Sequence, residues 1–212
     1  MTLKINEIFY SIQGESSRTG LPCIFIRLTY CNLRCSYCDT EYAFYNGQDM
    51  TISKIISKIK KYPSRLVMIT GGEPLLQKDC INLMEKLLCE KYSVMLETSG
   101  SLKLKDVPEA VIKIVDFKCP ASKMKSKNDW AILADIQEKD EIKFVIANKE
   151  DYDWSKKMIE KHNLNKICPI LFSPVSNKID ISKLADWILE DGLNVKLQMQ
   201  LHKYIWGDKK GV

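Results

Sequence analysis

Three cysteines lie within eight residues, in the stretch Cys31-Asn-Leu-Arg-Cys35-Ser-Tyr-Cys38. Thiolates are soft ligands, and three of them on one short loop can bind three irons of a [4Fe–4S] cube. The fourth iron of such a cube keeps an open coordination position. An open position indicates chemistry at the cluster rather than simple electron storage. The spacing C-x3-C-x2-C therefore predicts a cluster that binds a further small molecule.

Two other interpretations of the cysteines are weaker. A zinc knuckle needs a fourth Cys or His close by, but His162 and His202 are distant in the sequence. A disulfide framework is not typical of a chain without a secretion signal. The remaining five cysteines are scattered singly and are interpreted as buried, inert side chains: Cys23, Cys80, Cys89, Cys119 and Cys168.

The composition is ordinary for a globular protein, with 45% hydrophobic and 28% charged residues among 212. The first residues contain no apolar signal-peptide core, and no apolar run approaches ~18 residues, so neither export nor a membrane span is expected. Reduced cysteines then indicate a cytoplasmic protein. The net charge of +5 favours an anionic small molecule and is weak evidence for nucleic acid.

Strands alternate with helices along most of the chain. This alternation predicts a parallel sheet with right-handed crossovers. Six to seven mainly parallel strands are too few for a closed eightfold barrel, which usually takes ~250 residues. We therefore expect an α/β fold, a single-domain open partial β/α barrel over residues 1–212, with 1–22 as an N-terminal strand and loop within it. The expected strands are 4–11 (at the sheet edge), 23–30, 66–70, 93–97, 111–118, 141–147, 167–172 and 195–201, and the expected helices are 52–62 (capped by Thr51 or Ser53), 77–91, 128–136, 151–163 and 181–191.

A second feature follows the strand 66–70, as Gly71-Gly72-Glu73-Pro74. Two glycines allow a close backbone approach to a ligand, although they also suit a tight turn. Together with the cysteine spacing, this stretch resembles the radical S-adenosylmethionine (SAM) enzymes. The resemblance implies that the open iron binds the amino and carboxylate groups of SAM, that Gly72 lies near SAM, and that Glu73 supports the loop.

The resemblance also implies further contacts to SAM from later strand ends. Ser122 and Lys123 follow the strand 111–118 and are candidates for the carboxylate and ribose, although one lysine there could simply be solvated. Ser173 and Val175 could contact adenine through their backbone. Residues within the cysteine loop are expected beside the adenosyl group, namely Ser36, Tyr37, Cys38 and Asp39.

The stretch Ile12-Gln13-Gly14-Glu15 and Arg27 indicate a substrate site. The Gln13 amide offers a donor and an acceptor, which suits the edge of a pterin or purine. Arg27 lies on a mostly apolar strand, where an unpaired guanidinium is costly, so it should bind a carboxylate. An internal ion pair with a protein carboxylate is the alternative.

At this point the sequence closely resembles one family, the 7-carboxy-7-deazaguanine synthases. The resemblance covers nearly the whole chain from Ile5 onward. Ser16 is a departure, because glycine is more usual there, and some relatives have a longer insertion between the first two cysteines. The matching stretches are FYSIQGE, FIRLTYCNLRCSYCDT, TGGEP, LETSG and QLHKYIW.

The resemblance implies a carbon–nitrogen lyase of queuosine and deazapurine biosynthesis. A 5′-deoxyadenosyl radical from SAM would take a hydrogen from C6 of 6-carboxy-5,6,7,8-tetrahydropterin, and ring contraction with loss of ammonia would give 7-carboxy-7-deazaguanine. No side chain acts as a catalytic acid or base. Thr40 would bind Mg²⁺, since a hydroxyl is a hard ligand, or would merely cap the following turn. The residues implied to contact substrate are Ile12, Gln13, Gly14, Glu15, Arg27, Thr70, His202 and Val212.

The same resemblance implies a homodimer that receives its electron from flavodoxin or ferredoxin, with neither nucleic acid nor membrane as a partner. One alternative is another small radical SAM enzyme, such as an activase of glycyl-radical enzymes, which would need neither Gln13 nor Arg27. A non-enzymatic iron–sulfur or zinc module is the other alternative, and it would bind its metal without cleaving SAM.

Overall fold

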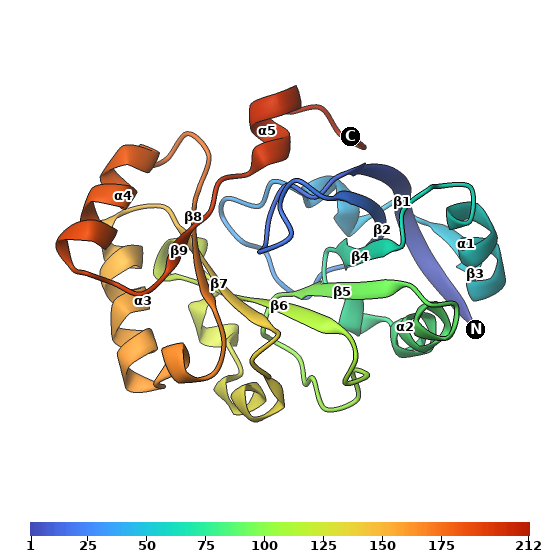
Figure 1. Cartoon of the computed structure of the whole chain (residues 1–212), viewed down its shortest axis with the longest axis horizontal. Helices are drawn as coiled ribbons and strands as arrows, with labels where there is room; N and C mark the ends of the chain where they lie inside the picture. Colours follow the sequence, from blue (N-terminus) through green and yellow to red (C-terminus); the bar gives the residue numbers. More distant parts are fainter.

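One nine-stranded sheet organises the computed structural model, which describes all 212 residues (Figure 1). The order of strands across the sheet is β3-β1-β2-β4-β5-β6-β7-β8-β9. The strands are β1 (Thr2–Ile12), β2 (Pro22–Leu28), β3 (Gln48–Thr51), β4 (Leu66–Gly71), β5 (Ser93–Thr98), β6 (Ile112–Phe117), β7 (Glu141–Ile146), β8 (Ile170–Pro174) and β9 (Lys196–Leu197).

Seven strands pair in parallel and form the expected open partial barrel, namely β2, β4, β5, β6, β7, β8 and β9. β1 is antiparallel to both of its neighbours, β2 and β3. The prediction that residues 4–11 form the edge was wrong, because β3 pairs with Thr2–Ile5 and covers that edge. Strand β3 has only four residues, and most of them are exposed. It therefore shows no alternation of hydrophobic and polar residues from which the sequence could predict a strand.

Four helices lie on the outer face of the curved sheet, with α1 and α2 towards one end and α3 and α4 towards the other, whereas α5 lies on the other side (Figure 1). The longer helices are α1 (Ile52–Ile59), α2 (Asp79–Cys89), α3 (Lys149–Lys161), α4 (Ile181–Glu190) and α5 (Leu201–Trp206). Short 3₁₀ helices connect them, namely η1 (Glu41–Phe44), η2 (Pro74–Leu76), η3 (Pro120–Ser122), η4 (Lys125–Lys127), η5 (Trp130–Asp135) and η6 (Leu164–Lys166).

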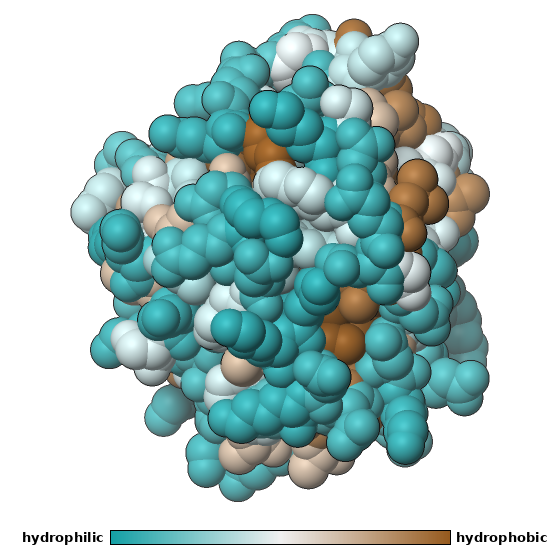
Figure 2. Space-filling model, turned by 90° about the vertical axis from the view of Figure 1, so that its left-hand side faces the viewer, coloured by the Kyte–Doolittle hydropathy of each residue, from teal (hydrophilic) through white to brown (hydrophobic).

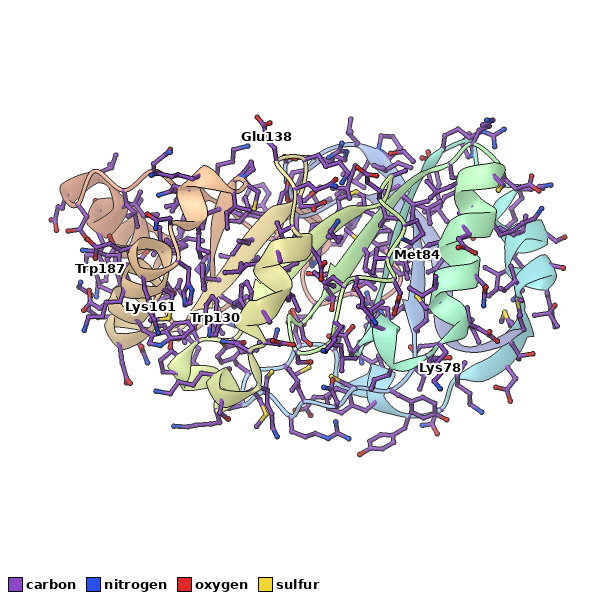
Figure 3. All side chains as sticks on the ribbon, turned by 90° about the horizontal axis from the view of Figure 1, so that it is seen from below. Lys78, Met84, Trp130, Glu138, Lys161 and Trp187 are labelled. Carbon is purple, nitrogen blue, oxygen red and sulfur yellow. The ribbon has the colours of Figure 1, made fainter.

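Side-chain alternation along each strand separates a hydrophobic core from a polar interior. On β7, Ile142, Phe144 and Ile146 pack into a core cluster of 37 residues under the helices. Lys143 and Val145 alternate with them and face the opposite side of the sheet, because successive strand residues point to opposite faces. Helix α2 contributes to the core through its buried face, which includes Met84, labelled in Figure 3.

Two elements differ from their sequence-based description. Residues 130–135 form η5 rather than an α-helix. The strand expected over 195–201 is reduced to β9, and Leu201 begins α5 instead. The backbone N–H of Leu201 donates to the Gly14 carbonyl at 3.0 Å, so a contact with the N-terminal loop replaces strand pairing there. Thr51 is the N-cap of α1, and its hydroxyl accepts from Lys54 N–H at 3.3 Å.

The surface is largely hydrophilic, with small separate hydrophobic patches on the end of the molecule shown in Figure 2. None of the helices has both the length and the apolar character needed to span a bilayer.

A buried ion pair at the amino ends of β6 and β7 gives the first prediction. Asp140 is fully buried and accepts from the Lys113 ammonium and the Lys113 N–H, each at 2.9 Å. Asp140→Ala should lower the free energy of unfolding by about 3–5 kcal/mol, because it leaves a buried charge without a partner. Urea denaturation measures the change.

The control is Glu138→Ala two residues away. The Glu138 side chain projects from the fold into solvent (Figure 3) and forms no ion pair. Its removal should change stability by less than about 0.5 kcal/mol. Equal effects of the two substitutions would contradict a stabilising role for the buried pair.

Candidate active site

A cavity of about 670 Å³ opens at the carboxyl ends of the parallel strands. This edge is where open and barrel-like α/β folds place their ligands. Residues from β1, β2 and β4–β8 line the cavity, and the C-terminal segment 207–212 lines it from the other side. The cavity therefore lies between the inner face of the sheet and the end of the chain.

The three cysteines of the loop after β2 all line this cavity and are half-buried: Cys31, Cys35 and Cys38. No group of three or more His, Cys, Asp or Glu side chains lies close enough together to hold a single metal ion. Three cysteines of a cube bind three different irons, so they need not converge on one point. The arrangement fits a [4Fe–4S] cluster better than a zinc ion.

The surroundings of the thiols disfavour free thiolates. Burial raises the pKa of the Cys31 thiol, and burial raises the pKa of Cys35 to about 11, although the nearby Lys118 ammonium acts in the opposite direction on both. A bound metal deprotonates a coordinating thiol outright. Iron ligation would therefore supply the positive charge that stabilises Cys31 and Cys35 as thiolates.

The two glycines after β4 allow the cysteine loop to pass closely over them. A Cβ on Gly72 would lie 2.1 Å from the Tyr30 carbonyl oxygen and 2.8 Å from the Cys31 Cβ. Gly71 has a φ of +149°, and a Cβ there would lie 2.2 Å from the Leu28 carbonyl oxygen. The paired glycines thus form both a turn and a close packing surface beneath the cluster loop.

Glu73 is completely buried and does not line the cavity. Its carboxylate accepts from the Ser99 N–H at 2.7 Å, the Ser99 hydroxyl at 2.6 Å and the Leu75 N–H at 3.1 Å. The Thr98 hydroxyl donates to it at 2.9 Å. Glu73 therefore holds the Gly71-Gly72 loop against the end of β5, and its side chain lies outside the cavity lining.

The residues predicted to contact SAM divide into two groups. Those that line the cavity are Tyr37, Cys38, Asp39, Gly72, Ser173 and Val175. Those that do not are Ser36, Glu73, Ser122 and Lys123.

The loop after β6 explains why three of these candidates are absent from the cavity. The buried Ser122 hydroxyl donates to the Cys119 carbonyl at 2.6 Å and closes η3. The exposed Ser36 hydroxyl donates to the Ala121 carbonyl at 2.6 Å. Lys123 is exposed, with its backbone in the left-handed region at a φ of 64°. The turn thus directs all three away from the cavity.

Two residues at the end of β6 line the cavity instead, although the sequence favoured Ser122 and Lys123 as the candidates from this strand end. Asp116 and Lys118 continue the inward alternation of Ile114. The Lys118 ammonium donates to Asp116 Oδ2 at 2.7 Å, while the buried Asp116 Oδ1 has no partner. Burial lowers the pKa of Lys118, but the attraction of Asp116 outweighs it and raises that pKa above its usual range. The two-residue alternation of strand side chains, continued from Ile114 to the end of the strand, could have identified them.

All eight residues predicted to contact substrate line the cavity. Gln13 is the most informative of them, with a side chain only 3% exposed. Its Oε1 accepts from the Glu15 N–H at 3.2 Å, but its Nε2 has no partner. A buried donor without an acceptor is costly, so the site is suited to a ligand with a hydrogen-bond acceptor at that position.

Arg27 forms an internal ion pair and also has donors free for a ligand. Its Nε donates to Glu7 Oε1 at 2.7 Å, so the internal ion pair is present. Its two Nη groups form no hydrogen bond or ion pair with the protein, and the side chain lines the cavity. The Tyr42 hydroxyl also donates to Glu7, at 2.8 Å. The ion pair orients the guanidinium and leaves its outer donors for a ligand.

The Thr40 hydroxyl is not used as a helix cap. Thr40 occupies the N-cap position of η1, yet its side chain accepts no capping hydrogen bond. The hydroxyl donates to Asp39 Oδ1 at 3.3 Å and lies on the cavity wall. An oxygen ligand is therefore available beside the third cysteine, next to a carboxylate.

A network of buried charges links the N-terminal loop to the sheet, and the sequence did not reveal it. The Lys143 ammonium contacts Glu15 at 2.8 Å and Glu97, and it lies 3.9 Å from Asp116. Burial disfavours the charged amine, but Glu15 and Glu97 outweigh it and raise the pKa of Lys143. The Thr70 hydroxyl extends the network by donating to Glu97 at 3.1 Å.

Helix α5 closes the cavity from the C-terminal side. A Cβ on Gly14 would lie 2.1 Å from His202 Nδ1, so only glycine lets the helix approach so closely. Burial lowers the pKa of His202. The Lys203 ammonium lies 3.0 Å from Asp39, and although burial acts against ionisation, this attraction lowers the pKa of Asp39 to about 2. Gln200 Nε2 donates to Glu15 at 2.9 Å.

Comparisons with known proteins agree with this geometry. A sequence model of the Radical SAM superfamily matches residues 25–122, which include all three cysteines and the paired glycines. The chain is 45% identical to a 7-carboxy-7-deazaguanine synthase from Koribacter versatilis, over 99% of this chain and 100% of that protein. It is 43% identical to one from Chlorobaculum tepidum, over 99% and 97% of the two chains. The crystal structure of QueE from Escherichia coli is similar at a TM-score of 0.79 and 25% identity, over 95% of each chain.

The fold and the cysteine loop define a radical SAM enzyme, for which a [4Fe–4S] cluster and SAM are the cofactors. The full-length similarity is more specific than the superfamily match, because it includes the N-terminal loop and the C-terminal helix. The chain belongs to the family of 7-carboxy-7-deazaguanine synthases.

The contact of Gly14 with His202 gives a second prediction. Gly14→Ala should displace α5, because the new methyl group cannot share space with the imidazole. Amide hydrogen exchange within residues 201–206 should then become at least tenfold faster. Ser17→Ala, in the exposed part of the same loop, is the matched control. Unchanged exchange in the Gly14 variant would show that α5 does not depend on this contact.

Proposed function

We propose that this chain converts 6-carboxy-5,6,7,8-tetrahydropterin to 7-carboxy-7-deazaguanine with loss of ammonia. The observation that supports this most directly is that one cavity contains the three cysteines, the unpaired Gln13 amide and the free side of Arg27. A cluster, a heterocycle and a carboxylate could therefore lie in contact. The relatives with full-length similarity carry the name of this activity.

The cofactors would occupy one part of the cavity and the substrate the other part. When bound, the cluster and SAM would supply the radical chemistry that removes hydrogen from the substrate. Cys31, Cys35 and Cys38 would hold the cluster, and Gly72 and Tyr37 would lie along SAM. Asp39, Ser173 and Val175 complete the SAM surface on the proposed assignment. The Tyr37 hydroxyl donates to the Val145 carbonyl at 3.2 Å, which fixes its ring in the wall.

The substrate is held by groups that the protein leaves unpaired. The Arg27 Nη groups bind the substrate carboxylate, because a guanidinium and a carboxylate form paired charge-assisted hydrogen bonds. Gln13 Nε2 donates to an acceptor on the pterin ring. Thr70 and Glu15 are held in place through Glu97 and Lys143, so the ring meets a preorganised polar wall. His202 and Val212 line the side nearest the C-terminus.

Magnesium is the third proposed cofactor, with Thr40 as its protein ligand. Mg²⁺ prefers hard oxygen ligands and keeps several waters. The Thr40 hydroxyl has only long contacts within the protein, to Asp39 Oδ1 at 3.3 Å and to Cys38 Sγ at 3.9 Å. An ion there would lie between the cluster loop and the substrate carboxylate and would hold the substrate in one orientation.

The chain acts by positioning, and no side chain is assigned as an acid or base. Helix α5 and the C-terminal segment cover the cavity and limit access of water to a reactive radical. This cover favours a small-molecule substrate over the glycyl-radical loop of a partner protein. We also propose a homodimer, by resemblance to the family, and a flavodoxin or ferredoxin as electron donor.

The reaction tests the proposal directly. The anaerobically reconstituted protein is incubated with dithionite, SAM, Mg²⁺ and 6-carboxytetrahydropterin, and the product is followed by mass spectrometry. We expect 7-carboxy-7-deazaguanine. An intact cluster that cleaves SAM without forming this product would refute the assigned substrate, and a colourless protein that binds zinc would refute the cluster.

Arg27 should affect turnover without affecting the cluster. Arg27→Ala should lower kcat/KM roughly 30-fold or more, because the substrate carboxylate loses a charged partner. Iron content and SAM binding should stay at the level of the unmodified protein. Glu7→Gln is the control, since it removes the negative charge of the internal partner but keeps the guanidinium and an acceptor oxygen for its Nε. A parallel loss of iron in Arg27→Ala would indicate a structural role instead.

Thr40 should determine the dependence on magnesium. Thr40→Val removes the hydroxyl at nearly constant volume and should raise the Mg²⁺ concentration for half-maximal rate at least tenfold. Thr40→Ser keeps the oxygen and should stay within about threefold of the parent protein. Identical magnesium curves for the two variants would exclude Thr40 as a ligand.

A further inference from the structure

The outer side of the cysteine loop is exposed and basic. Asn32, Arg34 and Ser36 alternate with the cysteines, and all three are exposed to solvent. The Arg34 guanidinium donates to the carbonyls of Cys31 at 2.8 Å and Leu33 at 2.6 Å. The cluster loop therefore has one side in the cavity and the other at the molecular surface.

The turns after β6 pack directly against this exposed side. The Ser36 N–H donates to the Ser122 carbonyl at 3.1 Å, and the Ser36 hydroxyl donates to Ala121. These turns (yellow-green) run along the lower edge of the molecule in Figure 3. They carry the exposed side chains of Lys123, Lys125 and Lys127. We call these three lysines and Arg34 the basic rim.

The charge of the basic rim is strongly one-sided. The two touching segments, residues 31–38 and 119–128, contain these four exposed cations and no acidic residue. The whole chain has a net charge of only +5 from 32 basic and 27 acidic residues. These four cations therefore form a local basic patch beside the cluster loop; residues 52–66 on and after α1 form a second segment without acidic residues, but it does not contact the cluster loop. None of the four forms an ion pair with the rest of the protein.

The rim is presented on a well-anchored loop. Ser122 closes the turn through its own hydroxyl, and the Met124 N–H donates back to that hydroxyl at 3.0 Å. The Ala121 N–H donates to the buried Asp151 carboxylate at 2.8 Å. A fixed array of charges loses little conformational freedom on binding, which favours recognition of a charged partner surface.

The position of the rim suggests the kind of partner. On the proposed function, on which this inference rests, each reductive activation moves one electron from outside into the cluster. The carrier is oxidised by one electron as the cluster is reduced by one. We propose that the basic rim is the docking surface for an acidic one-electron carrier protein, which it steers onto the exposed side of the cluster loop.

The test compares two charge-reversed variants in reduction by protein carriers. One is Lys125→Glu with Lys127→Glu, on the rim. The matched control is Lys54→Glu with Lys58→Glu on α1, where both lysines are exposed and form no ion pair. Both variants change the net charge equally, and neither alters a cavity residue. Cluster bleaching by photoreduced flavodoxin, and separately by a reduced plant-type ferredoxin, is followed by anaerobic stopped flow as salt is increased.

The rim variant should lose at least tenfold in second-order reduction rate at low salt with one or both carriers, and its salt dependence should flatten. The control should stay within about twofold of the parent protein. Excess dithionite should reduce all three proteins and support equal product formation, because a small reductant needs no docking surface. Failure of that dithionite reaction in the parent protein would count against the proposed function and not against the rim.

Three results would overturn the proposal. One is equal slowing in the rim and control variants, which would reflect total charge alone. Another is unchanged reduction of the rim variant by both carriers. The third is tight binding of a short single-stranded oligonucleotide that the rim substitutions abolish while reduction is unaffected, which would make the rim a nucleic-acid site.

Discussion

The buried ammonium of Lys143 is the interaction on which the cavity most depends. It contacts Glu15 from the N-terminal loop and Glu97 from β5, while Glu15 also accepts from Gln200 just before α5. One charge thus connects three parts of the chain that are far apart in sequence. Its burial is tolerated only because two carboxylates surround it, and each carboxylate in turn depends on the ammonium. It acts together with the Leu201–Gly14 backbone hydrogen bond and the Lys203–Asp39 ion pair, which also hold the substrate loop and the C-terminal helix over the sheet.

The same strand alternation that builds the core makes this charged interior possible. β4 directs Val67 and Ile69 into the core beneath the helices and Met68 and Thr70 toward the cavity side. The apolar side supplies most of the stability through burial, so the other side is free to carry groups that would be costly elsewhere. The buried Lys113–Asp140 pair lies at the opposite ends of the strands. Buried ion pairs therefore lie on both sides of the strands' midpoint, and the pairs towards the carboxyl ends line the cavity.

Local sequence patterns predicted the parallel sheet, most helices and the cluster loop, because each depends on spacing within a short segment. They could not predict β3, whose four residues become a strand only through pairing with β1, or the conversion of residues 201–206 to a helix against Gly14. The cavity residues also divide into those that local sequence could predict and those that depend on distant partners. Gln13 and Arg27 could be identified from their own chemistry, whereas Lys143 is a functional candidate only because of partners 128 and 46 positions away. Ser122 does not line the cavity because its hydroxyl closes its own turn.

The polar groups that remain unpaired define what the cavity can accept. Its buried or half-buried lysines are paired, since Lys118 pairs with Asp116, Lys143 with Glu15 and Glu97, and Lys203 with Asp39. Among the buried polar atoms of the lining, Gln13 Nε2 and Asp116 Oδ1 have no partner, and the outer face of Arg27 is also free. These groups require an acceptor, a donor and an anion from whatever binds. SAM and a carboxylated heterocycle together provide these groups. SAM carries an ammonium donor, and the heterocycle carries a carboxylate and ring acceptors. The internal ion pairs thus do more than stabilise the fold, because by neutralising most charges they leave a specific few to select the ligands.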